Sequence, residues 1–192
     1  MPAPTRPTAP TALAAVQRRH TSRLARRWLS ATGSLTARLK GLGTVRVIRL
    51  RQGHQSLRPR EQAVLGCTHG HVREVLLLVD DRPAVWARSA TTVQAAQGAW
   101  RAIHGLGNRP LAELLFSDPA VRRARLQSAP LPDTGPGAGR RARDWQRAHP
   151  TEGHPHWIRW SVFERHGQAL LVQEAFAPWV LAQQVPPPAL TL

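Results

Sequence analysis

The sequence predicts an α+β fold, in which helices pack on one side of a single antiparallel β-sheet. Two pairs of strand-like segments, 71–80 with 83–91 and 156–165 with 168–176, are each joined by a tight turn. Such hairpins build antiparallel sheets. The elements follow the order helices, strand, hairpin, helices, strand, hairpin, and this order is typical of an α+β architecture.

Two helices are predicted before the first strand. Residues 11–29 place apolar side chains at helical spacing, which predicts an amphipathic helix. Ser34 is a typical N-cap for a second, shorter helix, which ends at Gly41 and Gly43. The alternating segment 44–52 then predicts a strand.

The strongest strand pattern is the segment 71–80, which reads HVREVLLLVD. A tight turn at Asp80 and Asp81 leads into the partner strand over 83–91. Between the first strand and this hairpin, residues 53–69 are polar and predict a loop that holds one short helical turn.

Helical segments also separate the two hairpins. Residues 91–103 predict one helix, and residues 110–116 predict a shorter one with a proline near its start. The pattern over 119–131 is ambiguous, and we favour a strand. Residues 130–155 are rich in Pro, Gly and Arg, so we expect a long exposed loop with at most one helical turn around Trp145.

A length of 192 residues fits one domain, which we place at 23–180. Proline and arginine interrupt the apolar residues of segment 1–22, which therefore predicts a disordered leader and not a signal peptide. Residues 181–192 predict a loose tail. The chain has no apolar run of about 18 residues, as a membrane span needs.

The chain is strongly basic, with 27 Lys and Arg against 11 Asp and Glu and a formal charge of +16. Such a charge attracts polyanions. However, the arginines are spread along the sequence, and it shows no zinc-finger spacing, aromatic RNA-binding signature or recognition helix. We therefore expect no specific nucleic-acid partner, and the positive field suits an anionic small-molecule substrate. The single cysteine, Cys67, excludes an internal disulfide and fits a cytoplasmic protein.

Two charged residues interrupt apolar strand patterns. Because side chains alternate between the faces of a strand, Arg73 shares a face with Val75 and Leu77, and Glu174 shares one with Val172. Buried charges are rare unless they are paired. The pattern therefore indicates either a buried salt bridge or a pocket for a polar, anionic small molecule.

Arg88 is a second candidate cation for such a pocket. If it lies on the inner face, two arginines and one carboxylate would surround the cavity. Guanidinium groups bind carboxylates in a bidentate fork, so this set would suit a dicarboxylate. The alternative is that Arg88 faces solvent.

Other catalytic and cofactor motifs are absent from the sequence. It contains no nucleophile elbow, Walker A loop or dinucleotide fingerprint. Cys67, His69 and His71 lie close together, but a structural zinc site needs four ligands and no second pair of matching spacing follows. We expect no metal.

Four segments, in order, resemble the chorismate lyase family, which carries out the first step of ubiquinone biosynthesis. They span about residues 28 to 178 and read WLSATGSLTARL, VREVLLLVDDRPAVWARSATT, LGNRPLAELLFSDP and RWSVFERHGQALLVQEAFAP. The resemblance implies a single antiparallel sheet whose helices enclose a ligand cavity. It also implies cofactor-free conversion of chorismate to 4-hydroxybenzoate and pyruvate.

The resemblance also implies roles for individual residues. Arg73 matches the arginine that holds a substrate carboxylate, and Glu174 matches the glutamate near the ring hydroxyl. Leu35 and Leu111 match positions that line the pocket and offer backbone groups. Arg88 matches the arginine after the hairpin and is a candidate for the second carboxylate. The chain departs from the family pattern at Leu35, where methionine can occur, and at residue 87, where alanine replaces a glycine that can occur.

Two other functions stay open at this point. The first is a domain of the same fold that binds a small anion as an effector without converting it. The second is a basic nucleic-acid-binding protein, whose affinity would fall steeply with salt. We expect the protein to be a monomer.

Overall fold

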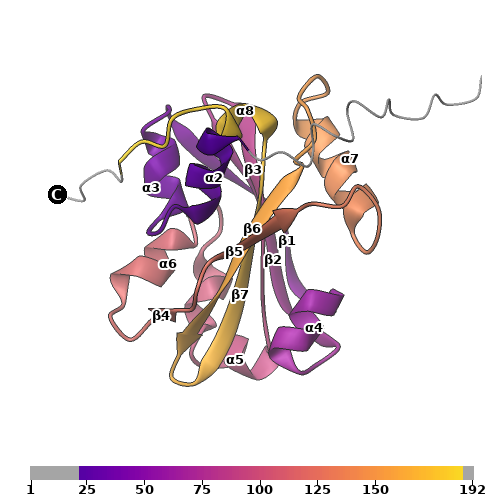
Figure 1. The fold of residues 1–192 in the computed structure, drawn as a ribbon. Coiled ribbons are helices and arrows are strands. Elements are labelled where there is room, and N and C mark those ends of the chain that lie inside the picture. The colour runs from indigo at the N-terminus through magenta and orange to yellow at the C-terminus, as the bar shows by residue number, and fades with distance from the viewer. Residues whose placement is uncertain (1–21, 188–192) are drawn as a thin grey trace, which may run out of the picture.

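All strands of the structure belong to one sheet in which every pairing is antiparallel (Figure 1). The structure is a computed structural model that describes residues 22–187. The strand order is β1-β2-β3-β7-β6-β4, and β5 also pairs with β6. The strands are β1 (Val45–Ser56), β2 (His69–Val79), β3 (Arg82–Thr91), β4 (Arg122–Arg123), β5 (Gln127–Pro130), β6 (Trp157–Arg165) and β7 (Gln168–Phe176). This arrangement confirms the predicted fold class.

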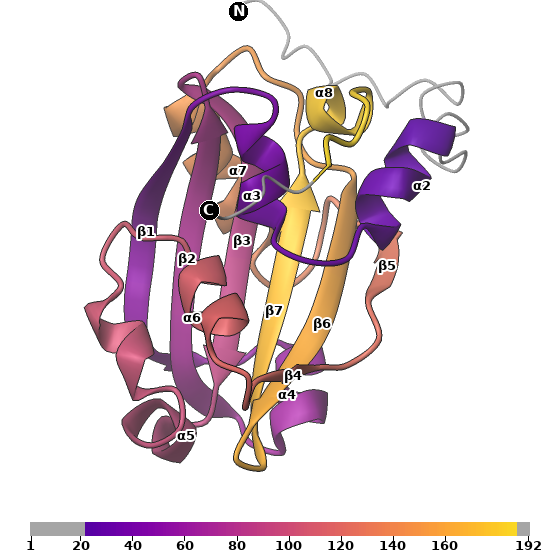
Figure 2. The same cartoon turned by 90° about the vertical axis from the view of Figure 1, so that its left-hand side faces the viewer.

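Helices cover both faces of this sheet, whereas the sequence pattern predicts only one covered face. In Figures 1 and 2, α3 and α6 lie on one face, and α4 and α7 lie on the opposite face. The reason is visible in β2, where every residue after His69 is buried, so both faces of the strand are covered. The helices are α2 (Arg23–Ser30), α3 (Leu35–Lys40), α4 (Pro59–Leu65), α5 (Val93–Gln97), the 3-10 helix η1 (Arg101–Gly105), α6 (Ala112–Ser117), α7 (Ala138–Ala148) and α8 (Pro178–Leu181).

Both predicted hairpins are present, with tight turns between their strands. Asp80 and Asp81 join β2 to β3 with φ angles of 47° and 62°. His166 and Gly167 join β6 to β7 with φ angles of 49° and 71°. Two successive residues at positive φ define the turn whose twist matches that of an antiparallel hairpin.

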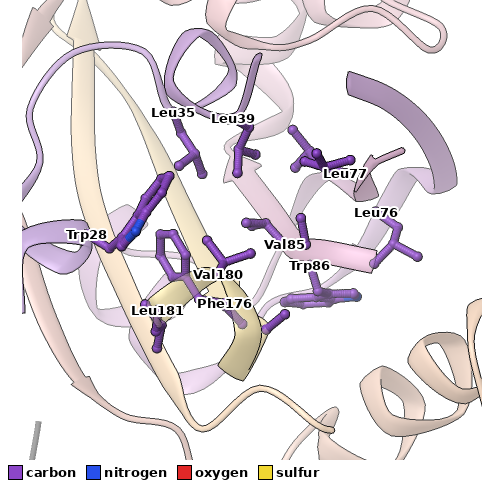
Figure 3. Packing of buried hydrophobic residues seen from close by; sticks show 14 of the residues in the cluster. Trp28, Leu35, Leu39, Leu76, Leu77, Val85, Trp86, Phe176, Val180 and Leu181 are labelled. Carbon is purple, nitrogen blue, oxygen red and sulfur yellow. The ribbon is translucent and has the colours of Figure 1, made fainter. Parts of the chain in front are cut away.

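The main core lies where α2, α3 and α8 meet the sheet. Trp28 packs against Phe176 with ring centroids 6.3 Å apart, and both side chains are fully buried. Figure 3 shows Val180 and Leu181 beside this pair. The indole of Trp28 also donates a hydrogen bond to the Gln183 carbonyl, 3.0 Å away. This cluster attaches the two ends of the domain to the sheet.

The tail is therefore not loose over all of residues 181–192. Leu181 is buried, and Arg38 donates a hydrogen bond to the carbonyl of Pro186 at 2.9 Å. Residues 188–192 lie outside the described part of the chain. The predicted leader lies outside it as well, except for Ser22, whose hydroxyl caps α2 by accepting from the Ala25 amide.

Two predictions, one of a helix and one of a loop, need correction. The helix expected over 91–103 begins after Thr92, which caps it, but it ends at Gln97, and a separate 3-10 helix follows. The loop expected over 130–155 contains the eleven-residue helix α7, whose Trp145 is fully buried. Few apolar residues mark α7 in the sequence, and tertiary contacts stabilise it. In the segment 119–131, the predicted strand is present as β4 and β5.

Within residues 22–187, none of the helices has the length and apolar character that a membrane crossing demands.

Candidate functional site

Residues on one face of the sheet line a pocket together with residues of the segments that carry α3 and α6. Figure 2 shows these two helices on the same face of the sheet. The pocket contains about 670 Å³ of space not filled by protein atoms, part of it open to solvent. Alternate residues of β2, β3 and β7 point into it, as the pleat requires. Its wall is mostly apolar and includes Val75, Leu77, Phe163, Val172, Leu115 and Phe116.

Four of the predicted site residues meet in this pocket: Arg73, Glu174, Leu35 and Leu111. Arg73 projects from β2 and Glu174 from β7. Leu35 begins α3, and Leu111 immediately precedes α6. The first residues of a helix leave backbone N–H groups without an intrahelical acceptor, so both leucines can offer main-chain donors as well as apolar side chains.

Arg73 is held rigidly at its end of the pocket. Its side chain is almost fully buried, and Nη2 donates to the carbonyls of Gly107 and Arg109 at 3.1 and 2.9 Å. Nε is buried and has no hydrogen-bond partner among the described residues. Burial, and then the charge of Arg49, lower the pKa of Arg73 to about 10, so it remains a cation at neutral pH. A buried cation with a free donor is suited to binding an anion.

Glu174 has one partner that the sequence does not indicate, Arg159 on the neighbouring strand β6. Arg159 Nε donates to Glu174 Oε2 at 2.6 Å. Arg159 is fully buried, and its Nη1 also donates to the carbonyls of Trp28 and Ala31, both at 2.9 Å. The ion pair therefore fixes the orientation of Glu174 and connects it to the end of α2.

Arg88 does not take the predicted position. It borders the pocket, but its guanidinium lies on the opposite face of the sheet. Arg88 Nε and Nη2 donate to the two carboxylate oxygens of Glu61 at 2.6 and 2.8 Å, and Nη1 donates to Glu74 at 2.7 Å. All three side chains are almost completely buried. Arg88 thus belongs to a buried ion-pair network and not to the set of pocket cations.

A β-bulge explains the position of Arg88. The turn pairs Val79 with Arg82, and counting outwards without interruption would pair Arg73 with Arg88 on one face. The register shifts by one residue between Leu77 and Leu78, so Arg88 pairs with Glu74 instead. A shift of one residue moves a side chain to the other face of a sheet.

Sequence reasoning also missed Arg123 on the short edge strand β4. This residue lines the pocket, and its guanidinium carbon lies 5.1 Å from the centroid of the Phe163 ring. The segment around it has an irregular pattern, and Arg122 and Arg123 are equivalent in the sequence. Only the pairing of β4 with β6 separates the exposed Arg122 from the half-buried Arg123.

The histidines near Cys67 do not gather into a metal-binding arrangement. In the part of the chain that the structure describes, no three His, Cys, Asp or Glu side chains are placed to hold one ion. His71 instead contacts the ring of His104, with centroids 4.4 Å apart, and its buried Nε2 has no hydrogen-bond partner among residues 22–187. Burial, and then the charge of His104, lower the pKa of His71 to about 4.

This lowered pKa predicts a loss of stability in mild acid. The unfolded chain binds the proton near pH 6.5, whereas folded His71 resists it down to about pH 4. Stability should therefore fall as the pH drops through this window, by about 2 kcal/mol at pH 5. Urea unfolding at pH 7 and pH 5 measures the difference. His71→Gln should reduce the pH dependence, and His166→Asn, at an exposed turn, should leave it unchanged.

An antiparallel sheet that holds an arginine and a glutamate in a mostly apolar pocket has the features of a small-molecule-binding site. Comparison with known proteins specifies the family. The family model for chorismate lyase matches residues 11–185. A probable chorismate pyruvate-lyase of Albidiferax ferrireducens is 43% identical over 166 residues, covering 80% of this chain and 83% of the relative. One from Azoarcus sp. is 41% identical, covering 85% and 88%. The chain belongs to the chorismate lyase family.

Solved structures with a similar fold include domains of transcriptional regulators. The effector domain of PhnF from Mycobacterium smegmatis has a TM-score of 0.49 at 14% identity, over 76% of this chain and 89% of that one. The C-terminal domain of the histidine utilization repressor from Pseudomonas syringae pv. tomato has a TM-score of 0.48 at 10% identity, over 75% and 97%.

Proposed function

We propose that this protein is a lyase that converts chorismate to 4-hydroxybenzoate and pyruvate, and that the pocket described above is its active site. The observation that carries the proposal is the meeting of Arg73 and Glu174 on one face of the sheet in a member of the chorismate lyase family. Within that family, the reaction is the first step of ubiquinone biosynthesis.

The two charged groups are spaced for a ring that carries a carboxylate and a hydroxyl at opposite ends. Arg73 pairs across the sheet with Ser89, which pairs with Val172, two residues before Glu174. Two strand spacings and a two-residue offset place the Cα atoms of Arg73 and Glu174 about 12 Å apart. Both side chains project from the same face of the sheet into the pocket, whose wall is mostly apolar.

The reaction does not require a covalent bond between the protein and the substrate. In chorismate, the C4 hydrogen leaves as a proton and the C3–O bond to the enolpyruvyl group breaks, which makes the ring aromatic. The released enolpyruvate takes up a proton and becomes pyruvate. Arg73 binds the ring carboxylate and fixes the orientation of the ring. The mostly apolar wall lowers the local dielectric constant and so strengthens these charge interactions.

Glu174 orients the hydroxyl group at C4. Because Arg159 binds Oε2 of Glu174, the other oxygen can accept a hydrogen bond from this hydroxyl. The fixed carboxylate then holds C4 in place, and with it the neighbouring C3, which carries the enolpyruvyl ether. Arg159 also contacts the carbonyls that precede the pocket-lining segment at Gly33, so the orientation of Glu174 depends on the placement of that segment.

The variant Glu174→Gln separates orientation of the substrate from proton transfer. Glutamine keeps an oxygen acceptor but loses the charge, and a hydrogen bond to a charged group contributes roughly 1.5–3 kcal/mol. We expect kcat/KM for chorismate to fall roughly 10- to 100-fold, with turnover still measurable. A loss of kcat to the uncatalysed rate would instead show that Glu174 is an obligatory base. Glu164→Gln, an exposed residue of β6, is the matched control.

Incubation of the full chain with chorismate and EDTA tests the proposed activity. We expect equal amounts of 4-hydroxybenzoate and pyruvate, formed faster than by the Arg73→Ala/Glu174→Gln double variant. Tight binding of 4-hydroxybenzoate without turnover would favour an effector-binding domain. Absence of both would overturn the assignment of the pocket.

The proposed compartment, cofactor requirement and oligomeric state are those that the sequence predicts. The protein would act in the cytoplasm, without a cofactor or metal, and as a monomer. Sedimentation should then give a mass near the 21.2 kDa of one chain, with or without 4-hydroxybenzoate.

A further inference from the structure

The pocket has a second cation that sequence reasoning did not find. Chorismate carries two carboxylates, one on the ring and one on the enolpyruvyl group. Arg73 can hold only one of them in the proposed orientation, and both carboxylates around Arg88 already occupy its guanidinium. On the basis of the proposed function, we infer that Arg123 binds the enolpyruvyl carboxylate and thereby distinguishes substrate from product.

The contacts of Arg123 leave donors free for a ligand. Its side chain packs on the Phe163 ring, and Nη1 makes one long hydrogen bond, of 3.4 Å, to the carbonyl of Gly33. Nε is buried and has no partner among the described residues. No carboxylate lies within salt-bridge distance of Arg123 in the described residues, although Glu174 is near enough to act on its charge. Arg123 is therefore a half-buried cation, and an incoming anion would neutralise its charge.

The order of the strands places each charge beside the correct part of the substrate. Arg73 lies on β2, Glu174 on β7 and Arg123 on β4, and the sheet order is β2-β3-β7-β6-β4. In the order of the strands, Glu174 therefore lies between the two arginines. Along the strands, Arg123 is level with Leu170, four residues before Glu174, but its long side chain reaches the Gly33 carbonyl and is close enough for the charge of Glu174 to act on it. In chorismate, the C4 hydroxyl is opposite the ring carboxylate and next to the enolpyruvyl ether at C3. If Arg73 holds the ring carboxylate and Glu174 the hydroxyl, the enolpyruvyl group lies on the side of Arg123.

This placement has a chemical consequence. When the C3–O bond breaks, the electron pair goes to the leaving oxygen, and the enolpyruvate gains negative charge close to its carboxylate. A cation at that position stabilises the leaving group. Once pyruvate departs, 4-hydroxybenzoate keeps its contacts to Arg73 and Glu174 but has nothing to offer Arg123. Arg123 should therefore favour binding of the substrate and not of the product.

The test compares Arg123→Gln with Arg122→Gln, its exposed neighbour on the same strand. Both variants remove one positive charge from β4. Two ligands are titrated against the intrinsic tryptophan fluorescence of each protein. The first is 4-hydroxybenzoate. The second is 3-(carboxymethoxy)-4-hydroxybenzoate, which keeps a carboxylate where the enolpyruvyl group stands but cannot eliminate it. Chorismate turnover is measured in parallel, and urea unfolding confirms that each variant folds.

Arg123→Gln should weaken binding of the carboxymethoxy compound, and lower kcat/KM for chorismate, by roughly 10- to 100-fold. Its affinity for 4-hydroxybenzoate should change less than about threefold. Arg122→Gln should match the wild type in every measurement, and Arg123→Lys should recover part of the loss. Equal loss of both ligands, or no loss of either, would overturn the inference.

The same measurements separate this inference from the proposed function. A wild-type protein that converts chorismate while Arg123→Gln behaves normally would keep the function and reject Arg123. A wild-type protein without turnover, in which Arg123→Gln still loses only the carboxymethoxy compound, would reject the lyase activity and keep Arg123 as the second anion contact.

Discussion

Arg73→Ala is expected to remove most chorismate turnover and most affinity for 4-hydroxybenzoate. Arg73 is almost fully buried, lines the pocket and is the cation proposed to bind the ring carboxylate. Truncation of one partner of a buried charge pair costs roughly 2–5 kcal/mol, much of it because the other charge is left unpaired. This range corresponds to a roughly 30- to 5,000-fold decrease in kcat/KM.

Steady-state kinetics and titration with 4-hydroxybenzoate measure this effect. The product still carries the ring carboxylate, so both substrate and product should suffer, in contrast to Arg123→Gln. Arg46→Ala is the control, because Arg46 is an exposed strand residue paired with the exposed Asp81. Normal kinetics from Arg73→Ala in a folded protein would end the assignment of Arg73 to the substrate carboxylate.

Glu61→Ala is expected to destabilise the fold strongly. The Glu61 carboxylate accepts hydrogen bonds from Arg88, from the Gln173 amide and from the Arg58 backbone, and it is fully buried. Its removal leaves the buried Arg88 with Glu74 as its only carboxylate partner, which Arg58 and Arg51 share. Breaking a buried ion pair in this way costs roughly 3–5 kcal/mol.

Urea unfolding at neutral pH measures this loss. Glu113→Ala, which removes an exposed carboxylate 4.0 Å from Arg109, should change stability by less than about 1 kcal/mol. Equal stability of the two variants would mean that the buried network adds nothing to the fold.

The same network predicts a further dependence on acid. Burial by itself would raise the pKa of Glu61, but the hydrogen bonds and charge of Arg88 outweigh it and hold the pKa below its usual value. A carboxyl group with a lowered pKa in the folded state stabilises the protein above the pKa of the unfolded chain, and this contribution is lost as the pH falls towards the folded-state pKa. Wild-type protein should therefore lose stability below about pH 4.5, and Glu61→Ala should lose less.

The local pattern of the sequence determined the hairpins and the charged positions inside them. Alternation along β2 and β7 is enough to place Arg73 and Glu174 on apolar faces, because the direction of a side chain within one strand depends only on its own pleat. The resemblance to the chorismate lyases then joined the two residues into one site. Ser34 was predicted as a helix cap for a similar reason, since its hydroxyl reaches the Ala37 amide three residues along the chain.

Tertiary structure alone decided which charged side chains face each other across strands. The β-bulge at Leu77 and Leu78 changes the register by one residue and sends Arg88 to the opposite face. Pairing of β4 with β6 selects Arg123 over Arg122, and pairing of β6 with β7 brings Arg159 to Glu174. Helix α7 likewise depends on Arg51 of β1, which pairs with the buried Asp144. Each of these outcomes depends on register or packing between segments that are distant in the sequence, so the periodicity of one segment carries no information about it.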